Sequence, residues 1–422
     1  MRVNTLILGA GVTGLSAAFH LQQKGDTDYL VLEKSSAPGG LCKSRHIKGF
    51  TFDQSGHLLH LHEDYTLQTF KQLLGANLHR LPRRAVIFTQ GVQMPFPFQA
   101  HLAYLPPAIR QECLQKARTA PLIAHPKTFK DWCLTAFGEG IYQYFLRPYN
   151  TKLWGVDPAE MTADWCGQFI PRPNLAQMEA AQTEQPGLGY NAYFYYPLKG
   201  GCQALTDALA AQVSNLRLNA PVTRVDLQNR TVWADNTPVS YRRLISTVPL
   251  AKLLKMTGNP ALENLAGQLE CRGITVLNIA AKKPFDAFHW AYCPDEEDPF
   301  FRVGAQSAFS PHAAPEGSSS FYVELPPQYP QTPQGLSRVL SRLAQKGIIE
   351  EKDVLFSFWQ TLPYAYVIYR PNRAQTVAQA TRLLQENGVY LAGRYGRWEY
   401  SFIERGFLQG RVCALALTKD LA

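Results

Sequence analysis

The stretch TLILGAGVTG, residues 5–14, decides the fold of this chain. It joins a short apolar run to three glycines, Gly9, Gly11 and Gly14, at the G-x-G-x-x-G spacing, and a helical pattern follows directly. The first glycine permits a tight turn, the second lets the backbone approach a pyrophosphate, and the third lets the helix pack close to the strand. The stretch therefore predicts the strand–turn–helix unit of a dinucleotide-binding domain, without distinguishing NAD from FAD.

An acidic residue stands where such a unit needs it. Glu33 closes the run YLVLE, about 20 residues after Gly14. A carboxylate at the end of a second parallel strand can hold a ribose hydroxyl. Because strand, turn, helix and acid occur in the required order, a nucleotide site is favoured over a glycine-rich turn without a ligand.

A second glycine pair extends the site. Gly39 and Gly40 would let the backbone pass close to a ligand that reaches beyond the adenosine, and GFTFDQSGH then predicts a short strand and a turn that carries His57. This succession resembles the second signature of FAD-binding proteins of the amine oxidase and protoporphyrinogen oxidase superfamily. NAD enzymes do not need the second glycine pair, so the resemblance turns the prediction towards FAD.

The composition is that of a globular protein. The 422 residues suffice for two or three domains, and the net charge of +9 is spread along the chain without a recognisable nucleic-acid module, so we expect no nucleic-acid partner. The eight cysteines show no C-x-x-C and no Cys/His cluster at zinc spacing, so we expect thiols in a reducing compartment and no metal site.

The sequence also carries an expectation about location. No apolar stretch approaches the roughly 20 residues of a membrane span, and the nucleotide turn begins almost at Met1, so we expect no signal peptide. We therefore expect a soluble, cytoplasmic protein without a membrane span. The oligomeric state stays open.

The rest of the chain predicts an α/β protein with a Rossmann-type FAD-binding domain, an inserted helical domain and an antiparallel-sheet substrate domain. Residues 64–81 show a helical pattern, and residues 85–99 predict a hairpin with Gly91 in its turn. The predicted FAD-binding parts are 1–84, 191–250 and 385–422, with a substrate-sheet hairpin at 85–99, the helical insertion at 100–190 and the antiparallel sheet at 251–384.

Several stretches resemble UDP-galactopyranose mutases of the eukaryotic-type branch, within the amine oxidase-like flavoproteins. The most specific is residues 137–168, where R-P-Y-N-x-K-x-W is followed by M-x-x-x-W-x-G. That pattern is much rarer than a dinucleotide turn. The others are SGHLLHLH (55–62), MPFPFQ (94–99), YNAYFYYPLKGG (190–201), YCPDEEDPFFR (292–302) and GRYGRWEY (393–400).

The resemblance implies an FAD enzyme in which reduced flavin is a nucleophile. In the mutases, flavin N5 attacks the anomeric carbon of a UDP-sugar, UDP leaves, and the sugar recloses with the other ring size. Pyranose and furanose forms of a nucleotide-linked sugar are thereby interconverted. The flavin must first be reduced, and NAD(P)H is a candidate reductant.

Carried over position by position, the resemblance also implies site residues. Those for the cofactor are Gly9, Gly11, Gly14, Glu33, Gly39, Gly40, Leu41, His57, Val222, Gly393, Arg394, Tyr400 and Ser401. Those for the substrate are Phe96, Phe98 and Gln99 for uracil, Asn191, and then Tyr292, Arg302, Tyr366 and Tyr400 for the diphosphate. The catalytic set is His57, Arg302, Tyr366 and Tyr400, with Arg302 the main phosphate ligand because a guanidinium can bind phosphate oxygens bidentately.

Two positions depart from the family pattern. Phe169 stands where the family has a second diphosphate arginine, and Phe309 stands where a tyrosine is expected. Arg172 is the candidate replacement for the missing arginine. These departures keep open an FAD-dependent oxidase or dehydrogenase of the protoporphyrinogen oxidase or amine oxidase type, acting on a less anionic substrate, and a flavin-binding protein without turnover.

Plainer structural roles stay open for several candidates. His57 can be a turn residue that bonds only backbone, Tyr366 a core tyrosine and Arg302 a surface ion-pair partner. The pair Phe96 and Phe98 can be ordinary core aromatics. His60 and His62 are expected on a strand surface.

Overall fold

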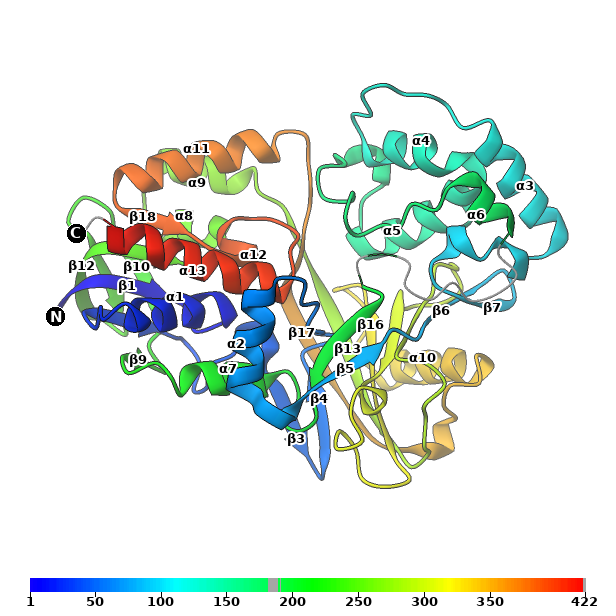
Figure 1. The fold of residues 1–422 in the computed structure, drawn as a ribbon, viewed down its shortest axis with the longest axis horizontal. Helices are drawn as coiled ribbons and strands as arrows, with labels where there is room; N and C mark the ends of the chain where they lie inside the picture. Colours follow the sequence, from blue (N-terminus) through cyan, green and yellow to red (C-terminus); the bar gives the residue numbers. More distant parts are fainter. Residues whose placement is uncertain (181–188, 190, 420–422) are drawn as a thin grey trace.

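The computed structural model describes residues 1–180, 189 and 191–419. They form two seven-stranded sheets, two small two-stranded sheets and a separate group of helices (Figure 1). This architecture confirms the predicted α/β class. The domain boundaries themselves stay a prediction.

The strand before the glycine turn lies inside the first sheet, whose order is β10-β11-β12-β1-β2-β9, with β18 also paired to β12. β1 is parallel to β12 and β2, its two neighbours. Parallel strands are covered on both faces, and Leu6, Ile7 and Leu8 are accordingly almost fully buried. The strands are β1 (Arg2–Leu8), β2 (Tyr29–Leu32), β9 (Leu216–Arg217), β10 (Val222–Asp226), β11 (Thr231–Ala234), β12 (Thr237–Ser246) and β18 (Val389–Leu391).

The first and last helices pack together beside this sheet. Helix α1 (Val12–Gln23) follows the glycine turn, and helix α13 (Ile403–Lys419) lies along it (Figure 1). Gly410 permits this approach, because a Cβ there would overlap the carbonyl oxygen of Thr13. The other helices of this half are α2 (Asp64–Leu74), α7 (Gln203–Ala210), α8 (Leu250–Met256), α9 (Pro260–Gly267), α11 (Arg373–Glu386) and α12 (Gly393–Gly396).

The second sheet has the order β17-β13-β16-β15-β14-β6-β7 and is antiparallel except where β14 meets β6. Helix α10 (Pro333–Gln345) covers one face through a cluster that contains Leu277, Val323 and Val339. The strands are β6 (Ala85–Thr89), β7 (Val92–Pro95), β13 (Cys271–Ala281), β14 (Trp290–Tyr292), β15 (Arg302–Ala305), β16 (Ser319–Leu325) and β17 (Val354–Val367). The predicted hairpin with Gly91 in its turn is confirmed as β6–β7.

The helices between the two sheet-forming parts of the chain stand apart in Figure 1. They are α3 (Pro107–Arg118), α4 (Phe129–Ile141), α5 (Arg147–Trp154) and α6 (Leu175–Ala180). Thr128 begins α4 with a capping box, in which its hydroxyl accepts from the Asp131 N–H and the Asp131 carboxylate accepts from the Thr128 N–H. Buried Phe129, Cys133 and Phe137 form the inner face of α4.

Two local predictions are wrong. The helix expected over 64–81 ends at Leu74, because Gly75 turns the chain at φ +54° and residues Leu78–Pro82 form β5, which pairs with β8 (Tyr193–Pro197). His60 and His62 are not on a strand, although the neighbouring Leu59 makes an isolated bridge with Tyr195. In the first case a long-range strand partner overrides the helical pattern. The remaining hairpin, β3 (Ser44–Ile47) with β4 (Phe50–Asp53), contains the predicted short strand.

Two kinds of feature are absent from the described residues. No helix of the described chain has the length and apolar character to cross a membrane. Within the same residues, no group of three His, Cys, Asp or Glu side chains is placed to hold a metal ion.

Candidate active site

The two glycine-rich turns meet at the carboxyl end of β1. Gly9 has φ +97°, and a Cβ on Gly14 would overlap the Gly9 carbonyl oxygen. The Gly39 N–H donates to the Ala10 carbonyl at 2.8 Å, and a Cβ on Gly40 would lie only 3.2 Å from the Gly11 Cα. The fold thus brings the predicted glycines of both motifs into one backbone cradle.

Glu33 faces this cradle from the end of β2. Its Oε2 accepts from the Ala10 N–H at 2.9 Å, and its Oε1 accepts from the Ser35 N–H at 3.0 Å. The Ala220 N–H donates to the Glu33 carbonyl, which brings the segment leading to Val222 to the same end of the sheet. Helix α1 begins here with Gly11 and no side-chain cap, so its first N–H groups are available to phosphate.

The C-terminal segment supplies a buried guanidinium. Arg394 donates to the carbonyls of Ser401 and Ala365 at 2.6 Å each, and it lies 4.6 Å from the centre of the Tyr400 ring. Burial opposes the charge of Arg394, but nearby tyrosines including Tyr395 outweigh it and raise its pKa. Within the described chain, the buried Arg394 Nε and Ser401 Oγ have no hydrogen-bond partner.

These observations fit a flavin dinucleotide. In the cradle, glycines let the two backbone turns pack against each other without intervening side chains, Glu33 presents a carboxylate, and unpartnered polar atoms lie on the closing segment. Gly393 brings the closing segment close to helix α1: a Cβ there would lie 2.8 Å from the Thr13 hydroxyl oxygen. Gly393 also has φ +79°, which favours glycine. Leu41 lies next to Gly40 of the cradle, in the short turn Gly40–Cys42.

Arg302 on β15 forms a largely buried ion pair. Its Nε and Nη2 donate to the two carboxylate oxygens of Glu324 at 2.6 Å each, and the Glu324 side chain is 1% exposed. Its Nη2 also reaches the Tyr366 hydroxyl at 3.4 Å. Burial lowers the pKa of Arg302, but the Glu324 carboxylate outweighs this effect and raises it. The pair therefore differs from a solvent-exposed surface pair.

Aromatic rings form a wall beside Arg302. Tyr366 stacks on Tyr400 with centroids 6.2 Å apart, and the phenyl ring of Phe169 meets Tyr400 edge-on at 4.8 Å. Trp154 and Trp165 also contact Tyr400, at 5.4 and 5.6 Å. Neither tryptophan is among the predicted site residues, although both belong to the distinctive 137–168 stretch.

The expected uracil residues are divided between two places. Phe96 stacks on Tyr292 at 4.8 Å, with the Arg83 guanidinium 4.8 Å from its ring centre, and Asn191 accepts a hydrogen bond from Arg83. Phe98 is instead fully buried against Phe145. Arg83 was not among the predicted site residues, because two adjacent arginines in PRRAV (82–86) carry no pattern of their own.

Gln99 lies with Phe98 in the interior. Its Nε2 donates to the Pro171 carbonyl at 2.6 Å, and its Oε1 is buried without a partner in the described part of the chain. The structure therefore brings together Phe96, Tyr292, Asn191 and Arg83. Phe98 and Gln99 do not belong to this group, because they are buried in the interior.

His57 is half-buried in the loop after β4. Burial, with smaller contributions from the positive charges of Arg394 and Arg302, lowers its pKa to about 4. The imidazole is therefore neutral near pH 7. Its Nδ1 is buried without a hydrogen-bond partner among the described residues. His57 thus lies within the electrostatic influence of both arginines of the site.

The departures from the family pattern have different surroundings. Arg172 is exposed, and its guanidinium lies 4.5 Å from the ring centre of Trp132 on α4. Phe309 is 1% exposed and packs against Tyr196 and Phe194, so it is a core residue. Phe169 alone of these three contacts the aromatic wall, through Tyr400.

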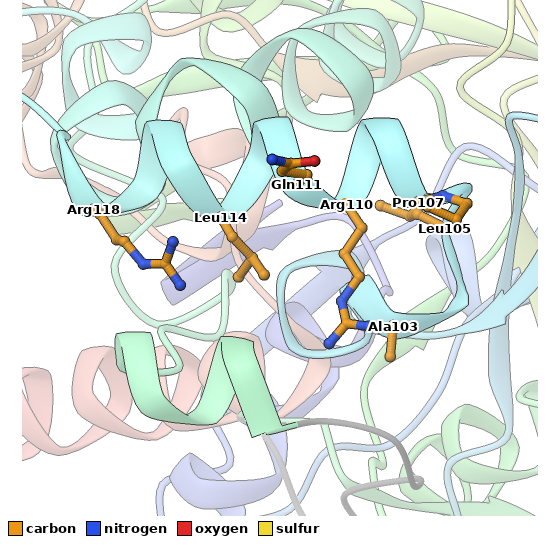
Figure 2. Close-up of a pocket in the computed structure, with 7 residues that line it drawn as sticks. All are labelled: Ala103, Leu105, Pro107, Arg110, Gln111, Leu114 and Arg118. Carbon is orange, nitrogen blue, oxygen red and sulfur yellow. The ribbon is translucent and has the colours of Figure 1, made fainter.

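A hollow of about 360 Å³ lies elsewhere, on the helical insertion (Figure 2). Arg110, Leu114 and Arg118 of α3 point into it. None of its lining residues belongs to the cradle or the aromatic wall, and Arg118 binds Glu179 of α6 at its edge. We therefore do not assign it to the candidate active site.

The fold and the site define a class of protein. The chain belongs to the flavin-containing amine oxidoreductase family, whose model matches residues 12–418. As a member of this family it is a flavin-dependent enzyme. Among solved structures, it is similar to a reduced UDP-galactopyranose mutase, with a TM-score of 0.93 and 27% identity over 100% of this chain and 96% of that chain.

More distant relatives agree in part. The chain is 24% identical over 269 residues to UDP-galactopyranose mutase of Mycoplasma pneumoniae, over 56% of this chain and 59% of that protein. It is 23% identical over 177 residues to a probable UDP-galactopyranose mutase of Klebsiella pneumoniae, over 38% and 43%. The matches thus span about half the length of these curated relatives. A putative protoporphyrinogen oxidase from Exiguobacterium sp. 255-15 shares the fold, with a TM-score of 0.75 and 15% identity over 99% of both chains.

Proposed function

We propose that the protein is an FAD-dependent mutase that interconverts pyranose and furanose forms of a nucleotide-linked sugar. The observation that carries the proposal is the placement of Arg302 beside Tyr366 and Tyr400, near the guanidinium of Arg394 on the closing segment. The similarity over the whole chain to a reduced UDP-galactopyranose mutase supports it. A cytoplasmic location is part of the same proposal.

FAD would be held mainly by backbone. The turn Gly9–Gly14 and the N-terminus of α1 would receive the pyrophosphate, and Glu33 a ribose hydroxyl. Leu41, Arg394 and Ser401 would face the flavin end. When bound and reduced, for example by NAD(P)H, the flavin supplies a nucleophilic nitrogen for the anomeric carbon.

The side chains of this protein would bind and orient the sugar nucleotide. Arg302 would contact the phosphates, with neutral hydroxyl donors from Tyr366 and Tyr400. Phe96 and Asn191 would contact the nucleoside from the group around Arg83. The aromatic wall would exclude water, and neutral His57 could exchange a proton without first losing one to solvent.

The test uses the purified flavoprotein, reduced with dithionite under nitrogen. We expect UDP to perturb the flavin absorbance and UDP-galactofuranose to be converted to the pyranose, as followed by chromatography. Arg302→Lys keeps a cation but loses the guanidinium fork, and should raise the Kd for UDP about tenfold or more. If UDP neither binds nor perturbs the reduced flavin, the proposal is wrong.

One observation favours a second function. Phe169 replaces the second arginine with a phenyl ring on Tyr400, which makes this wall more apolar. An FAD-dependent oxidase or dehydrogenase of the amine oxidase or protoporphyrinogen oxidase type would use such a wall for a less anionic substrate. It requires a substrate that bleaches the flavin anaerobically, with peroxide formed in air if the enzyme is an oxidase. Panels of amines and porphyrinogens test this directly.

A further inference from the structure

The loop that carries His57 is fixed at both ends. At its start, the Asp53 carboxylate accepts from the Ser44 hydroxyl, the Tyr196 hydroxyl and the Cys202 N–H, at 2.5, 2.7 and 3.0 Å. At its end, Leu59 exchanges two backbone hydrogen bonds with Tyr195, at 3.0 and 2.8 Å. Any change in this loop is therefore confined to residues 54–58.

The middle of the loop rests on the second sheet. The Ser55 hydroxyl donates to the Glu324 carboxylate on β16. Ser55 has φ +75°, a backbone conformation that residues other than glycine rarely adopt. The next residue, Gly56, lies directly on Tyr322, because a Cβ there would overlap its hydroxyl. The serine–glutamate bond thus helps to hold a strained backbone in place.

The same carboxylate binds the phosphate-contacting arginine. Glu324 Oε1 accepts from both Ser55 and Arg302 Nη2, and Glu324 Oε2 accepts from Arg302 Nε. The Glu324 side chain is buried, so little water is available to replace a lost donor. When an anion draws the Arg302 guanidinium away from Glu324, the Glu324 carboxylate loses two hydrogen bonds and keeps the one from the Ser55 hydroxyl. The bond to the loop then becomes stronger.

We propose that Glu324 is a positioning residue that couples anion binding at Arg302 to the order of the His57 loop. The inference rests on the proposed function in one respect, that Arg302 receives the anion. It adds a residue and a direction: an anion at Arg302 makes the loop more ordered. Because coupling is reciprocal, loss of the loop bond must weaken anion binding by the same factor.

The test measures both sides of this coupling on the flavoprotein, with UDP as the probe. Hydrogen exchange read by mass spectrometry follows peptides that cover residues 53–59, and calorimetry gives the Kd. In the unmodified protein we expect UDP to slow exchange in this segment. In Ser55→Ala we expect UDP to bind about fivefold more weakly and to leave exchange in the segment unchanged.

Two further variants and a control distinguish loss of the serine–glutamate bond from other effects of substitution. Ser55→Gly removes the hydroxyl but accepts positive φ without strain, so it should also lose the UDP response. Glu324→Gln removes the charge and should abolish it. Ser320→Ala is the matched control, because Ser320 is buried on the same strand and its hydroxyl donates to the Ala313 carbonyl, at 3.5 Å, instead of to Glu324. It should keep the full response.

The outcomes separate the two proposals. If UDP binds and slows exchange equally in the unmodified protein and both Ser55 variants, the coupling is wrong and the anion site stands. If UDP binds but never changes exchange in residues 53–59, the coupling is equally wrong. If UDP does not bind the unmodified flavoprotein, both the anion site and the coupling fall.

Discussion

The backbone cradle and the aromatic wall beside Arg302 are built in opposite ways. The cradle comes from the first 40 residues, and it presents backbone N–H groups where two glycine-containing turns pack closely. The wall gathers Tyr366, Tyr400 and two tryptophans from distant segments, and the charge of the adjacent Arg302 is already balanced by Glu324. A site made of backbone is encoded in local spacing, whereas a site made of charged side chains depends on partners that the fold supplies.

The largest expected effect comes from breaking the Arg302–Glu324 ion pair beside the wall. Arg302→Ala leaves the buried Glu324 carboxylate without its cation, so the free energy of unfolding should fall by about 4 kcal/mol. The double variant Arg302→Met, Glu324→Gln should recover most of this loss, because the stranded charge is gone. Urea unfolding followed by fluorescence measures both. Equal stability of Arg302→Ala and the unmodified protein would show that Glu324 is solvated.

The cradle should be sensitive to steric overlap rather than to a change of charge. Gly14→Ala places a methyl group against the Gly9 carbonyl oxygen, and we expect a loss of about 3 kcal/mol in stability together with loss of bound flavin. Thermal unfolding and the flavin content of the purified protein are the measurements. Gly167→Ala is the control, since a Cβ there meets no atom within 4 Å. A flavin-replete Gly14→Ala variant would contradict the close packing.

Acid should weaken the cradle through a histidine on α1. The Nδ1–H of His20 donates to the Ser16 carbonyl and its Nε2 accepts from the Tyr65 hydroxyl, both at 2.6 Å, and burial lowers the pKa of His20 to about 4. Between that value and 6.5 the unfolded chain binds a proton that the folded chain excludes, so the free energy of unfolding rises with pH.

This histidine should contribute up to about 3 kcal/mol between pH 4 and 6.5. Urea unfolding at a series of pH values measures the slope, and His20→Gln should make it shallower in this window. An unchanged slope would mean that His20 is protonated in the folded protein.

The smallest expected effect is a gain in UDP affinity from one substitution in the wall. Phe169→Arg restores a guanidinium beside Tyr400, and we expect the affinity for UDP to rise about tenfold, or ~1.4 kcal/mol. Phe169→Leu, which removes the ring without adding charge, is the control and should not gain affinity. Calorimetry decides. No gain with arginine would favour the less anionic substrate of the second function.

The sequence was informative where the signal was local. It predicted the glycine turn, the second glycine pair and the β6–β7 hairpin, and these are confirmed because a few neighbouring residues fix each backbone shape. It was wrong over 64–81, where β5 pairs with a strand more than a hundred residues later. The roles of the individual site residues stay predictions.

Other parts of the site had no local signal. Glu324 lies in SSFYVEL and reads as one residue of an ordinary strand, yet it is the partner of Arg302. Arg172 looked available to replace the missing arginine, but the structure directs it onto Trp132. Long-range packing decides which charged groups meet.

By itself, the sequence determined that this chain folds around a dinucleotide turn and that its pattern extends to a flavin family, since tight turns and close backbone approaches require particular residues at fixed spacing. Only the tertiary structure decided which arginine is neutralised, which aromatic rings form the wall and how the His57 loop meets the second sheet. Those features depend on the relative placement of strands that are far apart in the chain. No spacing along the sequence specifies that placement.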